Sequence, residues 1–134
     1  MSHQLSANFN ESEFRCPCCQ VTVVQPALVV ALEALRAKVG GPILIKSGYR
    51  CPKHNAEVGG VPRSQHVLGT AADISALNRS GRELFEMAQA IPAFNGLGVA
   101  PTWIHVDVRS APRVRWGYRF DTARKVWAEV PWKD

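Results

Sequence analysis

The chain has 134 residues, the usual size of a single domain, and its 46% apolar and 20% charged residues are ordinary for a folded globular protein. The net charge of +5 favours anionic partners, but the basic residues are scattered and form no nucleic-acid recognition motif. No apolar run reaches the ~18 residues of a membrane-spanning helix. We therefore expect one domain over residues 1–134, no membrane insertion and no nucleic-acid partner.

Residues 1–20 are predicted to form an N-terminal arm, which Phe14 anchors by turning inward. Residues 1–13 are polar and lack the basic and apolar regions of a secretory signal peptide. We therefore expect the chain to be cytoplasmic as synthesised, and to reach another compartment only if something else exports or releases it.

The cysteines form two short motifs. A C-x-x-C motif runs from Cys16 to Cys19 and also contains Cys18, and a C-x-x-H motif runs from Cys51 to His54. Together they could form a Cys3His zinc site. A cytoplasmic start argues against disulfides. Of these alternatives, we favour reduced thiols beside a turn.

The first half of the chain predicts a helix, two strands and a long loop between the strands. Leu28, Leu32, Leu35 and Val39 make one apolar stripe at helical spacing, which predicts a helix over residues 26–39. Residues 42–47 and 70–75 have the alternation of strands. Residues 48–65 contain several glycines and prolines and predict a loop, whose length in a small domain is typical of a functional segment.

The second half predicts a helix followed by several strands. Ser80 and Glu83 fit a capping box, so a helix should begin there and run to about Ile91, before Pro92. Residues 96–99, 103–108, 113–118 and 125–130 have strand patterns with short connections. The expected fold class is α+β, with a small antiparallel sheet and helices packed on it.

Two histidines and one aspartate have the chemistry of an open zinc site. A catalytic zinc takes three protein ligands and keeps one position for water. His66 ends the long loop, Asp73 lies on the strand that follows, and His105 lies within an apolar strand, where an unpaired imidazole is costly. From spacing alone, a structural histidine or a turn carboxylate stays an open alternative.

Three linked motifs resemble the M15 family of zinc D-alanyl-D-alanine carboxypeptidases and related cell-wall endopeptidases, including phage endolysins. The resemblance covers most of the chain, beginning with an N-terminal arm at residues 8–14. The motifs are Ser47-Gly48-Tyr49-Arg50 with Asn55, Ser64-x-His66-x-x-Gly69-x-Ala71-x-Asp73, and His105-Val106-Asp107-Val108-Arg109.

The resemblance implies a fold like that of hedgehog and the D-Ala-D-Ala carboxypeptidases, with zinc held by His66, Asp73 and His105. It also implies that Arg50 stabilises the oxyanion formed during peptide hydrolysis. The expected function is a zinc metallopeptidase that cleaves peptidoglycan stem peptides as a carboxypeptidase or an endopeptidase. We expect a monomer, which would act on the cell wall after release if it is a phage lysin.

The general base is less clear from the motifs. Many members of the family carry an acid three positions before the last ligand, or a histidine two before it, and here those positions are Thr102 and Trp103. Asp107 should point the same way as His105, because residues two apart on a strand share a face. It could therefore act as the base, or it could orient a ligand. Glu57 is the reserve candidate for the base.

The expected substrate contacts come from the two loop motifs, and aromatic residues on the later strands are expected to line the cleft. The missing upstream acid or histidine leaves one alternative function, a non-catalytic, zinc-stabilised module that binds the cell wall. The substrate contacts are Tyr49, Ser64 and Gln65, and the aromatic residues are Trp103, Trp116 and Tyr118.

Overall fold

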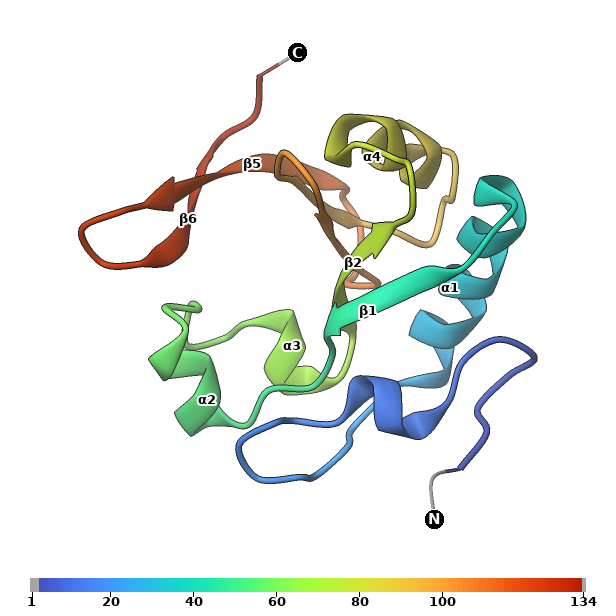
Figure 1. Ribbon diagram of the computed structural model, residues 1–134, viewed down its shortest axis with the longest axis horizontal. Coiled ribbons are helices and arrows are strands. Elements are labelled where there is room, and N and C mark those ends of the chain that lie inside the picture. The colour runs from blue at the N-terminus through green and yellow to red at the C-terminus, as the bar shows by residue number, and fades with distance from the viewer. Residues whose placement is uncertain (1–2, 134) are drawn as a thin grey trace.

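A computed structural model describes residues 3–133 of the chain; residues 1, 2 and 134 of the predicted domain lie outside the described residues. Figure 1 shows one curved sheet with the helices α1 and α4 beside it. The elements in chain order are the 3-10 helix η1 Glu11–Phe14, α1 Pro26–Val39, β1 Ile43–Ser47, α2 Pro52–Glu57, α3 Gln65–Leu68, β2 Ala71–Ala76, α4 Gly81–Gln89, β3 Gly96–Val99, β4 Ile104–Asp107, β5 Val114–Asp121 and β6 Val126–Pro131.

The two long helices begin and end for the reasons that their sequences predict. Helix α1 has Pro26 in its first turn and ends at Gly40, whose φ of 74° is a left-handed cap. Helix α4 has the predicted capping box between Ser80 and Glu83, and ends two residues before Ile91. Helix α1 contributes Leu28, Leu32 and Leu35 to the buried core, and α4 contributes Leu84 and Phe85. The predicted α+β class is confirmed.

The sheet has the strand order β1-β2-β4-β3-β5-β6. Every neighbouring pair is antiparallel except β3 and β5, which are parallel. The predicted antiparallel pairing is therefore found at four of the five pairs, and the pair of β3 and β5 departs from it. The reason is that β4 ends beside the start of β3, where Asp107 pairs with Gly96, and the short connection 108–113 leads to Val114 on the other side of Gly96. Strand β5 therefore starts at the same end as β3 and runs in the same direction.

One face of the central strands carries apolar core residues, and the other carries polar residues of the candidate site. Ala72, Val106 and Leu97 occupy one row across β2, β4 and β3, and all three belong to the apolar core under the helices. The next row is Asp73, His105 and Gly98, which by strand alternation faces the opposite side. The sheet therefore places two polar side chains of the candidate site directly behind the core.

The segment predicted to be one long loop, residues 48–65, contains a helix. Helix α2 begins after Cys51, whose sulfur accepts the His54 N–H at 3.5 Å, and has Pro52 in its first turn. Helix α3 begins at Gln65, at the end of this segment. A six-residue helix is too short to produce a visible apolar period, which is why the sequence pattern missed it.

The N-terminal arm packs against the start of this segment. Phe14 is 1% exposed, as predicted, and its carbonyl accepts the backbone N–H of Tyr49 at 2.9 Å. A side chain at Gly48 would overlap the Phe14 backbone, so only glycine allows this close approach.

Among residues 3–133, no helix combines the length and the apolar character needed to cross a membrane.

Candidate active site

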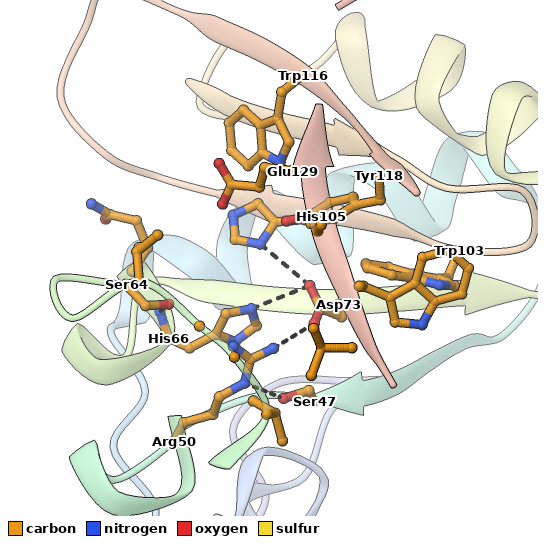
Figure 2. A pocket seen from close by; sticks show the side chains of 18 of the residues that line it. Ser47, Arg50, Ser64, His66, Asp73, Trp103, His105, Trp116, Tyr118 and Glu129 are labelled. Carbon is orange, nitrogen blue, oxygen red and sulfur yellow. Dashed lines mark hydrogen bonds and ion pairs between the residues drawn. The ribbon is translucent and has the colours of Figure 1, made fainter. Parts of the chain in front are cut away.

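The structure brings the three predicted metal ligands together. His66 lies on α3, Asp73 on β2 and His105 on β4, and the strand register pairs Asp73 directly with His105. Asp73 Oδ1 lies 3.2 Å from His66 Nε2 and 3.3 Å from His105 Nδ1. Figure 2 shows both imidazoles turned toward this one carboxylate. Since all three residues are buried, the cluster is screened little by solvent.

The outer nitrogen of each imidazole donates a hydrogen bond to an oxygen atom. His66 Nδ1 donates to the Gly48 carbonyl at 2.7 Å, and His105 Nε2 donates to Asp107 Oδ2 at 2.6 Å. In a neutral imidazole, the other nitrogen then carries a lone pair. The inner nitrogens of both rings therefore direct lone pairs toward an anionic oxygen, an arrangement that needs a cation or a proton at its centre.

The pKa values of the two histidines shift in opposite directions. Burial lowers the pKa of His66. Burial also disfavours charge on His105, but contacts with the carboxylates of Asp107 and Asp73 outweigh it and raise the pKa of His105 to about 9. A proton on His105 thus satisfies the cluster when no metal is bound. Two nitrogens and a carboxylate oxygen are also ligands that zinc prefers, so the donor set fits a metal.

Arg50 holds the other oxygen of the same carboxylate. One guanidinium nitrogen lies 2.9 Å from Asp73 Oδ2, and Nε donates to the Ser47 hydroxyl at 3.2 Å. A third contact joins the guanidinium to the Asn55 side-chain oxygen at 3.3 Å. Arg50 lines the cavity next to the two histidines. The motif Ser47-Gly48-Tyr49-Arg50 with Asn55 therefore acts as one unit, in which Ser47 and Asn55 orient the cation.

Asp107 lies behind His105, away from the cavity. It is fully buried, and both of its oxygens accept hydrogen bonds from the Arg109 side chain, at 2.8 and 2.7 Å. Burial would raise the pKa of Asp107, but the bonds from Arg109 and His105 hold it well below its usual range. The interpretation of Asp107 as a general base is not supported by this placement, because its oxygens are already occupied and it does not line the cavity.

A cavity of about 1080 Å³ opens in front of the ligand cluster. Figure 1 shows the β5–β6 hairpin on one side and α2 and α3 on the other. The predicted contacts Ser64 and Gln65 line the cavity, as do the aromatic residues Trp103, Trp116 and Tyr118. Tyr49 does not line it. Partial burial raises the pKa of the Tyr49 hydroxyl, and so do the nearby thiols of Cys19, Cys51 and Cys16.

Sequence reasoning missed the contribution of β6. Trp127 and Glu129 line the cavity, and they pair across the hairpin with Phe120 and Tyr118. Figure 2 shows Glu129 on the same side of the site as Trp116 and His105. Alternation along residues 125–130 places Trp127 and Glu129 on one face. The short connection between the two strands predicts the hairpin of β5 and β6, but the pairing of β5 with β3, which brings the hairpin to the site, has no local signal in the sequence.

A second group of potential metal ligands lies outside this cavity. Cys16, Cys19 and Cys51 offer sulfur atoms that all lie within 4.8 Å of one another. The four cysteines are unpaired thiols. The two candidate metal groups are therefore chemically distinct, one with nitrogen and oxygen ligands and the other with sulfur.

Comparison with known proteins agrees with this arrangement. The family model of Peptidase M15 matches residues 7–107, which include all three clustered ligands and Arg50. No curated protein matches the chain. Peptidases of this family are metalloenzymes, and the structure supplies a buried group that can hold an ion. Because the match covers most of its length, the chain belongs to the Peptidase M15 family.

Proposed function

We propose that this protein is a zinc-dependent peptidase that cleaves peptide bonds in the stem peptides of bacterial peptidoglycan. The observation that carries the proposal is the convergence of His66, Asp73 and His105 on one point, beside Arg50 and at the base of a large cavity. Family membership supports peptide hydrolysis. Zinc is the proposed ion because two imidazole nitrogens and one carboxylate oxygen form a common catalytic zinc set.

Zinc bound by these residues would act as a Lewis acid that polarises the scissile carbonyl. Arg50 supplies the second positive charge. Its guanidinium is anchored by Ser47 and Asn55 and lines the cavity, so it can donate hydrogen bonds to a carbonyl oxygen that becomes negatively charged. Asp107 acts as a positioning residue. It fixes the proton on His105 Nε2 and thereby keeps Nδ1 free to bind the metal.

We further propose Glu129 as the general base. Besides Asp73, the carboxylates among the described residues of the cavity wall are Glu57 and Glu129. Glu129 lies close enough to Arg109 and Tyr118 to raise the pKa of each. The Arg109 guanidinium in turn lies 5.2 Å from the Trp116 ring, whose centroid is 5.1 Å from that of His105. These contacts place Glu129 on the His105 side of the cavity, whereas Glu57 belongs to α2.

The shape and lining of the cavity support an extended peptide substrate. Aromatic side chains from β5 and β6 line it together with Ser64 and Gln65 at the start of α3. The net charge of +5 would favour anionic wall polymers. A role as a phage lysin, released to the wall from inside the cell, is part of the same proposal.

The decisive experiment is digestion of purified peptidoglycan followed by mass spectrometry of the released fragments. We expect peptide-bond cleavage that a chelator abolishes and added zinc restores, and a product mass that tells a lost terminal D-Ala from an internal cut. The matched control is His105→Gln, which should be inactive under all three conditions. Release of sugar fragments without peptide cleavage would refute the proposal.

The alternative function is a zinc-stabilised module that binds the cell wall without cutting it. Thr102 and Trp103 favour it, because neither can replace the upstream acid or histidine of many family members. A protein that sediments with peptidoglycan and contains zinc, yet releases no fragment from walls of several chemistries, would establish this alternative and exclude Glu129 as a base.

A further inference from the structure

Four cysteines gather where the N-terminal arm meets the start of α2. Cys16, Cys18 and Cys19 lie on the turn that follows η1, and Cys51 lies directly before α2. Figure 1 shows the loop after η1 passing close to α2. The sulfurs of Cys16, Cys19 and Cys51 lie within 4.8 Å of one another, and the Cys18 thiol shares a hydrogen bond with Cys51. Residues 35 positions apart thus converge at one point.

Backbone N–H groups surround these sulfurs. Cys16 Sγ accepts the N–H of Cys51 at 3.4 Å and also those of Cys18 and Cys19. The Cys19 sulfur accepts the N–H of Val21. Hydrogen bonds from N–H groups favour a sulfur that carries negative charge. The chain therefore points backbone N–H groups at the sulfurs of Cys16 and Cys19, and these two sulfurs lie next to that of Cys51.

The turn that presents Cys16 and Cys19 is tightly closed. The N–H of Gln20 donates to the Cys16 carbonyl, and the N–H of Cys16 donates to the Val21 carbonyl, both at 2.9 Å. Gln20 adopts a φ of 66°, a left-handed conformation that costs free energy for any residue except glycine. This unfavourable conformation occurs in the turn that brings the sulfurs of Cys16 and Cys19 together.

Charge repulsion makes this arrangement of thiolates unfavourable without a cation. Cys16 is fully buried, and its sulfur faces those of Cys19 and Cys51. A disulfide would join two of these three sulfurs and leave the third with Cys18 as its possible partner. A zinc ion is satisfied by several thiolates at once, in a closed tetrahedral set that leaves no position for substrate.

We propose that Cys16, Cys19 and Cys51, with Cys18 as the fourth ligand, bind a structural zinc ion that is separate from the His66, Asp73 and His105 cluster. Cys51 follows Arg50 directly in the chain, and the N–H of Arg50 donates to the His66 carbonyl at 3.2 Å. The ion would therefore fasten the N-terminal arm to the peptide that carries Arg50. This inference does not depend on the proposed peptidase activity.

The test counts zinc and identifies its ligands in the whole protein. After zinc addition and removal of excess metal under reducing conditions, we expect two zinc ions per wild-type chain. X-ray absorption at the zinc edge should show a sulfur shell at about 2.3 Å as well as nitrogen and oxygen at about 2.0 to 2.2 Å. The double variant His66→Gln/His105→Gln should keep one zinc with an all-sulfur shell.

Cysteine variants provide the reverse measurement. Cys16→Ser/Cys19→Ser should keep one zinc, now without sulfur neighbours. Cys18→Ser should weaken zinc retention at the sulfur site, while the matched control His54→Asn should not; the opposite result would overturn Cys18 as the fourth ligand. If the cysteine variants fail to fold, the His66→Gln/His105→Gln protein still decides the matter. Its binding no zinc while retaining four titratable thiols, or a disulfide in the native wild type, would overturn the proposal.

Discussion

At the scale of single residues, Arg50 is the proposed oxyanion donor and is not one of the proposed metal ligands. Its guanidinium contacts the Asp73 oxygen that faces away from the histidines, so the ligand cluster can form without it. We predict that Arg50→Ala lowers kcat by a factor on the order of 100 to 1,000, because the oxyanion loses its charged donor. Zinc content should stay unchanged.

The measurement is turnover on a defined stem peptide, with zinc content determined on the same preparation. Arg50→Lys is the matched control, since it keeps the charge but loses the fork that reaches Ser47, Asp73 and Asn55 together, and it should recover only part of kcat. Normal turnover in Arg50→Ala would remove Arg50 from the mechanism.

For Asp107 we expect a substitution to weaken zinc binding, whereas the Arg50→Ala change should leave the zinc content unchanged. Its carboxylate orients His105 and is itself held by Arg109. We predict that Asp107→Asn weakens zinc binding at the histidine site by about 10 to 100-fold, since the imidazole loses its anionic partner. Excess zinc should then restore much of the activity. Activity that stays low at saturating zinc would show instead that Asp107 takes part in proton transfer.

Gly96 offers an independent way to disturb the same carboxylate. A Cβ on Gly96 would overlap both oxygens of Asp107, so Gly96→Ala must displace them. We predict a loss of zinc affinity similar to that of Asp107→Asn, measured by competition with a chelator. Gly41→Ala is the matched control, because a Cβ at that position meets no neighbouring atom. Equal zinc affinity in the two alanine variants would contradict the positioning role.

At the scale of elements, the β5–β6 hairpin and helix α2 each offer one glutamate to the cavity. Glu129 comes from the hairpin and Glu57 from α2. Base catalysis is typically worth about 100 to 10,000-fold. We predict that Glu129→Gln loses activity by that order while zinc stays bound, and that Glu57→Gln loses far less. Both glutamates are exposed, so neither change should affect folding. The reverse ranking would assign the base to α2.

The position of the β5–β6 hairpin also shows which part of the candidate site the sequence does not predict. The resemblance of three motifs to the M15 family predicts the ligands and Arg50, and local alternation predicts the strands that carry Asp73 and His105. The approach of Trp116 and Tyr118 to His105 depends on the pairing of β5 with β3 and on Gly98, where a side chain would overlap both aromatic rings. Glu129 enters the cavity through a second pairing, β5 with β6. The pairing of β5 with β3 joins strands that β4 separates in the chain and leaves no local pattern, whereas β5 and β6 form a hairpin with a short connection.

At the scale of the whole molecule, the ligand cluster couples metal binding to folding and to pH. The three ligands come from α3, β2 and β4, so an ion bound by them stabilises the folded chain and not the unfolded one. In the metal-free protein, a proton on His105 takes over part of this role, because its pKa is raised to about 9. Zinc must displace that proton to bind.

The sign of the pH dependence follows from this competition. The raised pKa of His105 contributes stability that is fully present below its unfolded value of ~6.5 and is lost as pH rises through about 9. Zinc binding at this site should strengthen over the same window.

We therefore predict that the rise in unfolding temperature caused by a fixed free zinc concentration grows between pH 6 and about 8.5. The measurement is a set of thermal melts with and without buffered zinc, for the wild type and for His105→Gln. Subtracting the variant removes the titration of the cysteines, which both proteins share. A zinc-induced shift that is the same at every pH, or the same in both proteins, would show that His105 does not exchange its proton for the metal.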